Sequence, residues 1–221
     1  DVLFIEDPEE KGKYHPRISA QFTYIYRSLN EYEKWCYDRL YNDFFYRRHN
    51  EFWYGKAMWK LPPLLESTSM LTCAEDLGMI PDCVPAVMDA LQILALEIQR
   101  MPKDPKVEFG NTWSYPYYSV CTTSTHDMPG IRAWWESDKA MSQRFYNNVL
   151  HEGGEAPYFA EPWICSKIVD LHLNSPAMLC VLPLQDWLSI DGQLRRQNPN
   201  EELINIPAIS RHYWRYRMHI T

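Results

Sequence analysis

Several common signatures are absent from this 221-residue sequence. Its six cysteines contain no CxxC pair and its seven histidines show no HxxxH spacing, so no zinc site, thioredoxin-like motif, metal or other cofactor is predicted. Neither GxGxxG nor GxxxxGK[ST] occurs, which argues against a nucleotide-phosphate loop. No apolar run approaches the roughly 18 residues that a membrane helix needs, and no signal peptide is visible.

An excess of basic residues is also lacking. Lysine and arginine number 22 against 29 acidic residues, which gives a net charge of −7. This balance argues against nucleic acid and against an anionic membrane surface as partners. The scattered cysteines lie partly in apolar runs, where free cysteine behaves as a small hydrophobe, so we expect a reduced, cytoplasmic protein. Because the chain begins at Asp1 without methionine and stops at Thr221, we expect it to be part of a longer protein.

Aromatic residues are abundant. They make up 14% of the chain, including 9 Trp and 15 Tyr. Flat rings serve as sugar platforms in carbohydrate sites, although most rings in a chain of this size belong to cores or interfaces. Trp113 and Tyr117, at the end of a long proline-containing loop, are candidate substrate platforms, and ordinary packing is the alternative for both.

Four short apolar runs predict buried strands at residues 70–74, 93–98, 118–124 and 178–182. Helical patterns separate them, and strands that alternate with helices indicate a parallel sheet in an α/β fold. Four strands are too few to close a barrel, but they are half of an eight-stranded one.

The N-terminal part has a different pattern. Rings alternate at 22, 24 and 26, which predicts a strand, and the capping-box pattern from Ser28 to Glu31 predicts a helix over 29–47. A second helix is predicted over 51–61, ended by Pro62 and Pro63. We therefore expect an irregular segment and helical insertion over 1–66 and the parallel sheet over 67–221.

Two of the predicted strands end in acidic residues. LTCAEDLG places Glu75 after the first strand, and TTSTHD places Asp127 after the third. In parallel α/β folds the chemistry lies at the carboxyl ends of strands, and carboxylates on neighbouring strand ends suit glycosidic bond chemistry. Glu75 is equally consistent with a simple N-terminal charge of the next helix, and His126 with a capping or packing residue.

Several of these motifs, in this order, resemble a known family. Cys73-Ala-Glu-Asp-Leu-Gly78, Ser124-Thr-His-Asp127 and Arg132-Ala-Trp-Trp135 resemble the 4-α-glucanotransferases (amylomaltase or disproportionating enzyme) of glycoside hydrolase family 77. The segments 98–102, 182–186 and 212–217 look like the larger type of plant cytosol and some bacteria, which carries starch-binding modules ahead of the catalytic domain. The resemblance runs from about residue 28 to the C-terminus.

The resemblance implies a (β/α)8 TIM barrel and retaining transfer between α-glucans, with maltose or malto-oligosaccharides as substrates. By motif, Glu75 corresponds to the general acid/base and Asp127 to the carboxylate that stabilises the transition state. His126 corresponds to a hydroxyl-binding residue of the same subsite. Asn205, in Asn-Ile-Pro, resembles a family Asn-x-Pro segment near the site.

One part of the family pattern is missing. The nucleophilic aspartate of the family lies in an Arg-x-Asp-His type motif that does not occur here. We therefore expect the C-terminal half of the barrel plus an N-terminal helical insertion, inactive without the missing barrel half and prone to self-association through its open sheet edges. Two alternatives remain, a hydrolase of the α-amylase-like group and a non-catalytic glucan-binding fragment.

Overall fold

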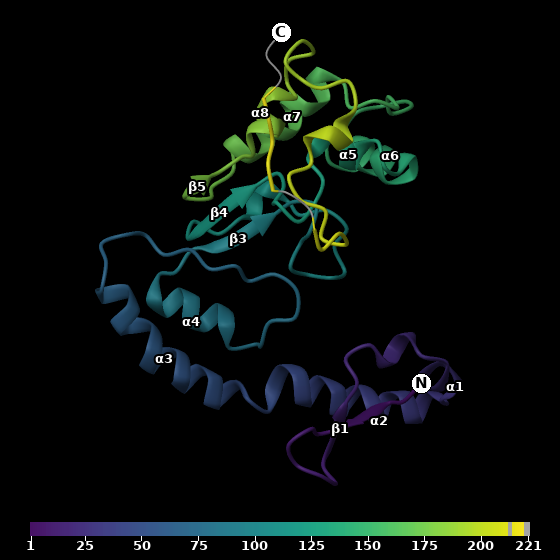
Figure 1. The fold of residues 1–221 in the computed structure, drawn as a ribbon, viewed down its shortest axis with the longest axis vertical. Helices are drawn as coiled ribbons and strands as arrows, with labels where there is room; N and C mark the ends of the chain where they lie inside the picture. Colours follow the sequence, from purple (N-terminus) through teal and green to yellow (C-terminus); the bar gives the residue numbers. More distant parts are fainter. Residues whose placement is uncertain (212–213, 219–221) are drawn as a thin grey trace. The chain divides into compact units, whose positions relative to one another are not determined.

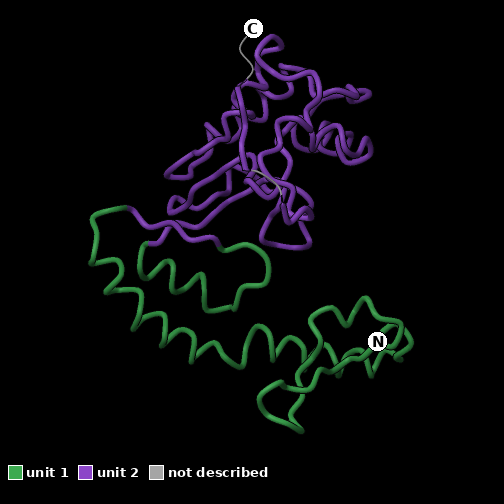
Figure 2. The backbone as a smooth tube through the Cα atoms, in the orientation of Figure 1, with its two compact units in different colours: residues 1–70, 76–92 green, residues 71–75, 93–221 purple. Residues whose placement is uncertain are grey.

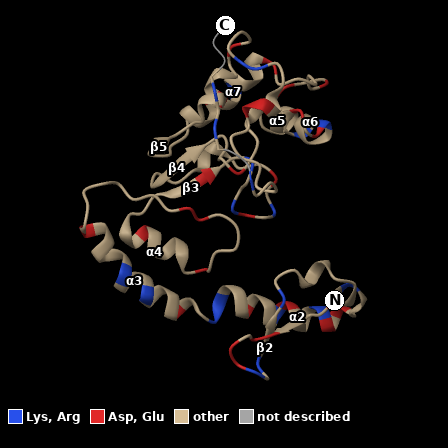
Figure 3. Ribbon diagram, viewed as in Figure 1, with Lys and Arg blue, Asp and Glu red and all other residues tan. Residues whose placement is uncertain are grey.

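The computed structural model describes residues 1–211 and 214–218. These residues form two compact units, one of residues 1–70 and 76–92 and the other of 71–75 and 93–221 (Figure 2). The segment 76–92, which the sequence assigned to the barrel half, thus groups with the N-terminal unit. Basic and acidic residues are interspersed along both units (Figure 3). Within the described residues, no helix is both long and apolar enough to cross a membrane.

The first unit is mainly helical (Figure 1). Its elements are β1 (Phe4–Glu6), β2 (Tyr14–Pro16), η1 (Ala20–Phe22), α1 (Tyr24–Ser28), α2 (Glu31–Asn42), the π-helical turn η2 (Asp43–Arg47), α3 (Asn50–Glu66) and α4 (Val84–Leu91). β1 and β2 pair antiparallel. Tyr37 of α2 is buried and donates its hydroxyl to the Leu3 carbonyl oxygen at 2.8 Å, which fastens the hairpin to the helix.

The strand predicted from the alternating rings is wrong. Residues 20–28 form η1 and α1, because the Thr23 hydroxyl accepts a hydrogen bond from the Tyr26 amide and caps a helix there. The predicted capping box is also displaced by two residues. It joins Asn30 and Glu33, with both reciprocal hydrogen bonds at 2.9 Å.

The predicted end of the second helix at Pro62 and Pro63 is wrong as well, because α3 continues through both prolines to Glu66. A proline inside a helix removes a hydrogen bond, but its fixed φ near −65° is itself helical. The pair therefore weakens α3 without ending it.

The second unit contains a parallel sheet of β3 (Ala95–Ile98), β4 (Ser119–Thr122) and β5 (Leu179–Cys180) in the order β3-β4-β5. Its helices are η3 (Thr112–Ser114), α5 (Ile131–Trp135), α6 (Lys139–Asn148), α7 (Pro162–Leu173), α8 (Leu184–Leu188) and η4 (Pro199–Glu202). The first predicted strand is reduced to a single parallel bridge from Cys73 to Leu94. The described sheet therefore has three strands and a bridge instead of four strands.

The core of the second unit lies among α5, α6 and α7. Trp135, Phe145 and Ile164 are fully buried there. The Trp135 indole donates to the Pro157 carbonyl oxygen at 3.0 Å, so the one polar atom of this large ring is satisfied. All six cysteines are free thiols.

Candidate active site

The carboxyl edge of the parallel sheet gathers most of the predicted functional residues. Cys73 pairs in parallel with Leu94, just before β3, and β4 pairs with β3 as far as Thr122 and Ile98, so residues 74–75 and the residues after Thr122 leave the sheet in the same direction. One strand lies between these two exits, which separates them laterally by roughly 10 Å. Glu75 comes two residues after the Cys73 bridge, and Asp127 comes five residues after the end of β4.

Asp127 is held in a small polar cluster. The Asn205 side chain donates to Asp127 Oδ1 at 2.7 Å, and His126 Nε2 lies 3.2 Å from Asp127 Oδ2. Asn205 is buried, whereas the side chains of His126 and Asp127 are 51% and 58% exposed. The structure therefore brings together three of the predicted site residues and leaves the carboxylate accessible from solvent.

The loop that carries His126 and Asp127, residues 123–130, is named here the β4–α5 loop. Arg100, just after β3, donates from Nε and Nη2 to the Thr123 carbonyl oxygen at 3.0 and 2.8 Å. The same Nη2 donates to the Pro129 carbonyl oxygen at 2.7 Å. Burial lowers the pKa of Arg100 to about 10, partly offset by the nearby Asp186 carboxylate, so the guanidinium remains cationic at neutral pH.

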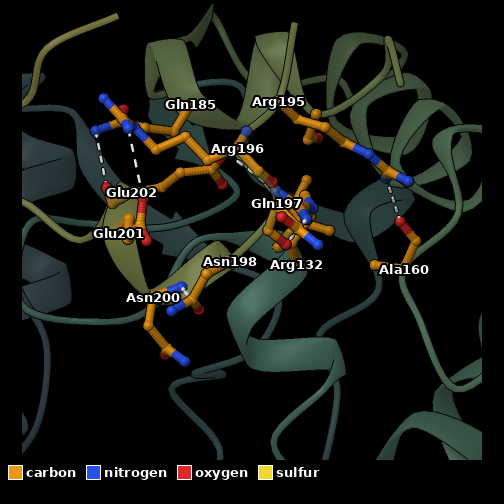
Figure 4. Close-up of polar contacts among 12 residues, drawn as sticks. Arg132, Ala160, Gln185, Arg195, Arg196, Gln197, Asn198, Asn200, Glu201 and Glu202 are labelled. Atoms are coloured by element: carbon orange, nitrogen blue, oxygen red, sulfur yellow. Dashed lines mark hydrogen bonds and ion pairs between the residues drawn. The ribbon is translucent and has the colours of Figure 1, made fainter. Parts of the chain in front are cut away.

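The segment that presents Asn205 is fastened by a buried ion pair, which Figure 4 shows in close-up. Arg132 of α5 lies 3.0 Å from Glu202 of η4, with side-chain exposures of 7% and 9%. Glu202 Oε1 also accepts from the Arg196 amide at 2.9 Å. Burial raises the pKa of Glu202, while the Arg196 amide and the Arg132 guanidinium act in the opposite direction. This network fixes the chain three residues before Asn205.

A cavity of about 320 Å³ lies beside this cluster. It lies between the β4–α5 loop and the residues that follow β5, and its lining includes His126, Met128, Val181, Leu203 and Ile204. An apolar hollow beside polar groups at a sheet edge is a common form of ligand site.

Glu75 has a different environment from Asp127. Its side chain is exposed, and its segment is tied to the sheet by the hydrogen bond from the Ala74 amide to the Leu94 carbonyl oxygen, at 2.9 Å. No hydrogen bond or ion pair to the Glu75 side chain occurs within residues 1–211 and 214–218. An exposed carboxylate of this kind is free to meet a ligand or a further part of the protein.

The predicted ring platforms lie elsewhere. Tyr117 precedes β4, and its carbonyl oxygen accepts from the Met178 amide at the start of β5, so it lies at the amino edge of the sheet. Trp113 lies in η3 and is exposed. Neither ring contacts Asp127 in the part of the chain that the structure describes, and their binding role stays a prediction.

Three residues of the site region were missed by sequence reasoning. The Trp214 ring lies 4.9 Å from the His126 ring, centroid to centroid. Arg100 and Asp186 both support the β4–α5 loop, and they lie two and four residues after the ends of the apolar runs 93–98 and 178–182. Their positions after predicted strands are a signal that could have marked them as candidates, but their hydrogen bonds to this loop are tertiary contacts that the sequence pattern does not encode. His212 and Tyr213, part of the ring-and-arginine cluster in the sequence, lie outside the described residues.

No three His, Cys, Asp or Glu side chains converge as metal ligands in the described ranges. The arrangement instead offers carboxylates, an amide and an imidazole at one sheet edge. Such groups hydrogen-bond to hydroxyls and transfer protons, the chemistry of an α/β protein acting at its carboxyl edge.

Comparison with known proteins identifies the family. Residues 22–221 match glycoside hydrolase family 77, described as 4-alpha-glucanotransferase, and the chain belongs to this family. It is 40% identical over 221 residues to the 4-alpha-glucanotransferase DPE2 of Oryza sativa subsp. japonica, covering 100% of this chain and 23% of that protein. It is 26% identical over 230 residues to the 4-alpha-glucanotransferase of Chlamydia muridarum, covering 96% of this chain and 41% of the relative.

The fold agrees with the family. An amylomaltase from Streptococcus agalactiae, solved in complex with acarbose, superposes with a TM-score of 0.51 at 17% identity, over 66% of this chain and 27% of that one. The chain thus spans less than half the length of the relatives it matches.

Proposed function

We propose that this chain is part of a 4-α-glucanotransferase that moves an α-1,4-linked glucosyl or glucan unit from maltose or a malto-oligosaccharide to an acceptor glucan. The observation that carries the proposal is the cluster at the carboxyl edge, where Asn205 and His126 hold Asp127 at 2.7 and 3.2 Å. Family membership supports α-glucans as the substrate class.

In the proposed mechanism Glu75 is the general acid/base. Protonated, it gives its proton to the departing sugar oxygen, and ionised, it accepts the proton of the incoming hydroxyl. Its exposure in this chain leaves it accessible to the glycosidic oxygen. In retaining enzymes the carboxyl groups of the acid/base and the nucleophile lie about 5–5.5 Å apart. The nucleophile of the completed protein must therefore lie at about this distance from Glu75.

Asp127 has a different role in this proposal. It accepts hydrogen bonds from the sugar hydroxyls next to the reacting carbon, which become stronger acids as positive charge develops in the ring. The Asn205 amide donates to Asp127 Oδ1 and so orients the carboxylate. The remaining lone pairs of Asp127 can then accept hydrogen bonds from the sugar. His126 binds a hydroxyl of the same sugar, and the adjoining cavity accommodates part of the glucan.

The nucleophile is proposed to come from a part of the protein outside these residues. No Arg-x-Asp-His type motif is present in the sequence, so the chain by itself is proposed to bind glucan without turning it over. The partner that completes it is the other half of a (β/α)8 barrel, with starch-binding modules preceding it in the longer protein.

The test is to incubate the chain with maltose and glycogen, alone and together with the complementary barrel half, and to separate the sugars by chromatography. We expect no turnover by the chain alone, and free glucose with lengthened acceptor chains once the other half is added. Glucose release without lengthened glucans would indicate hydrolysis and contradict transfer. Glucan binding without turnover in the completed protein would favour a non-catalytic binding role.

A further inference from the structure

A buried carboxylate lies behind the β4–α5 loop and has no part in the mechanism described so far. Asp186, in α8, is 2% exposed. Its Oδ2 accepts from the Thr123 and Ser124 hydroxyls at 2.6 and 2.7 Å, and its Oδ1 accepts from the Ile131 amide at 2.8 Å. These three donors offset the cost of holding a negative charge away from water, and all three come from the β4–α5 loop or the first residue of α5.

These three donors lie at the two ends of the loop. Thr123 and Ser124 open it, whereas Ile131 is the first residue of α5. Asp186 therefore fixes the span within which His126 and Asp127 lie and also satisfies a free amide at the α5 N-terminus, where negative charge is favourable. The support comes from α8, which begins 57 residues after Asp127 in the sequence.

Gly130 provides the space for this arrangement. A Cβ atom there would lie 2.8 Å from Asp186 Oδ1. The φ of Gly130 is −60°, which any residue adopts, so backbone conformation does not require glycine at this position. The requirement comes from the close approach of the carboxylate.

Arg100 fixes the same loop from the other neighbouring strand, through the carbonyl oxygens of Thr123 and Pro129. A buried anion from the β5 side and a cation from the β3 side thus hold both ends of one short segment. Charged hydrogen bonds are stronger and more directional than neutral ones, which suits them to fixing a loop rather than merely filling space.

We propose that Asp186 is a positioning residue for glucan transfer: through Thr123, Ser124 and Ile131 it sets the conformation in which the β4–α5 loop presents Asp127 to the sugar. This inference rests on the proposed function. Asp186 also lines the adjoining cavity, but both of its carboxylate oxygens already accept hydrogen bonds from the β4–α5 loop and α5. The predicted consequence of losing it is a misplaced Asp127, which weakens binding of the transition state more than binding of the ground-state sugar.

The first test uses hydrogen–deuterium exchange of this chain, and so needs no activity. Asp186→Asn and Thr123→Val should speed amide exchange in residues 123–131 about 10-fold or more, whereas Thr123→Ser, which keeps the hydroxyl, should leave it within about twofold. Asp191→Asn, an exposed aspartate three residues after α8, is the matched control and should have no effect. Unchanged exchange in both Asp186→Asn and Thr123→Val would overturn the proposed anchoring.

The second test measures transfer in the protein completed with the rest of the barrel. Thr123→Val and Asp186→Asn should lower kcat by about 10- to 100-fold with KM for maltose within about twofold, and Thr123→Ser should restore kcat. A normal kcat in a variant whose loop exchanges faster would overturn the positioning role, as would losses that follow only the folded fraction measured by circular dichroism. Absence of transfer by the unmutated protein would contradict the proposed function and leave the exchange test to decide the anchoring.

Discussion

The two carboxylate segments at the sheet edge begin alike and are supported differently. Each follows an apolar run, but Asp127 lies in a loop that is fixed by side chains from three separate segments, Arg100, Asp186 and Asn205. Glu75 is exposed, and the boundary between the two compact units falls directly after it. The comparison teaches that the local sequence determines where a carboxylate leaves a sheet, whereas distant residues determine how rigidly it is held.

The first prediction concerns the rate of glucan transfer when the proposed acid/base Glu75 is replaced. In the completed protein, Glu75→Gln should lower transfer by about 10²- to 10⁴-fold, because it removes the group that exchanges protons with the sugar oxygens. Folding should be nearly intact, since Glu75 is exposed. The measurement is the initial rate of glucose release and chain lengthening from maltose, with circular dichroism as the folding readout.

Glu66→Gln, at the end of α3, is the matched exposed control and should retain the full rate. Near-normal transfer by Glu75→Gln would eliminate Glu75 as the acid/base. A large loss of structure in the same variant would show that the Glu75 side chain contributes to the fold, contrary to the difference drawn between its segment and the β4–α5 loop.

The second prediction concerns stability on the Asp127 side. Arg132→Met should lower the free energy of unfolding of this chain by about 3–5 kcal/mol, because it leaves Glu202 buried without its ionic partner. Urea unfolding followed by circular dichroism measures the change. Arg144→Met breaks the exposed contact with Glu108 and should cost much less, because solvent screens this pair. Equal losses of unfolding free energy in the two variants would show that burial does not make the Arg132–Glu202 pair more important for stability than the exposed pair.

Sequence reasoning captured three of the four predicted strands and their parallel pairing, because short apolar runs between helical segments leave few other arrangements. It placed Asp127 shortly after a strand that the structure contains, whereas the strand predicted before Glu75 is a single bridge. It missed the path of α3, because a proline pair ends helices more often than helices pass through it.

The contacts that fix the β4–α5 loop could not be predicted from local sequence patterns, because they come from residues distant in the sequence. Asn205 lies 78 residues from Asp127 in the sequence and was found only through a family resemblance. Asp186 lies in α8 and Arg100 follows β3, so their hydrogen bonds to the loop are tertiary contacts that no periodicity encodes. Trp214 beside His126 belongs to the same class.

A third prediction concerns the hydrogen bond that orients the Asp127 carboxylate. Asn205→Ala should lower transfer in the completed protein by about 10-fold, because Asp127 Oδ1 loses the amide that orients it. Asn205→Asp should be more harmful, since it places a second negative charge against Asp127. Initial rates on maltose measure both, and Asn200→Ala, on the exposed side of η4, is the control. If Asn205→Asp were as active as the unmutated protein, the contact would have no role in orienting Asp127.

The smallest expected effect distinguishes buried from exposed carboxylates by the sign of their pH dependence. Burial raises the pKa of Glu202, so the native state binds its proton more tightly than the unfolded chain does. Its contribution therefore favours the fold below the ordinary value of 4.5 and is lost as the pH rises through the raised native pKa. The difference in unfolding free energy between the unmutated chain and Glu202→Gln should decrease from acid toward neutral pH.

Glu108 provides the opposite case. Its hydrogen bonds with Arg144 lower its pKa, so its contribution is present above 4.5 and is lost as the pH falls through the lowered native value. The difference between the unmutated chain and Glu108→Gln should therefore increase from acid toward neutral pH. Urea titrations of both variants across this range measure the two slopes. Slopes of the same sign would mean that Arg132 and the Arg196 amide stabilise the Glu202 anion more than burial destabilises it. The ion pair would then hold the Asn205 segment more strongly as the pH rises.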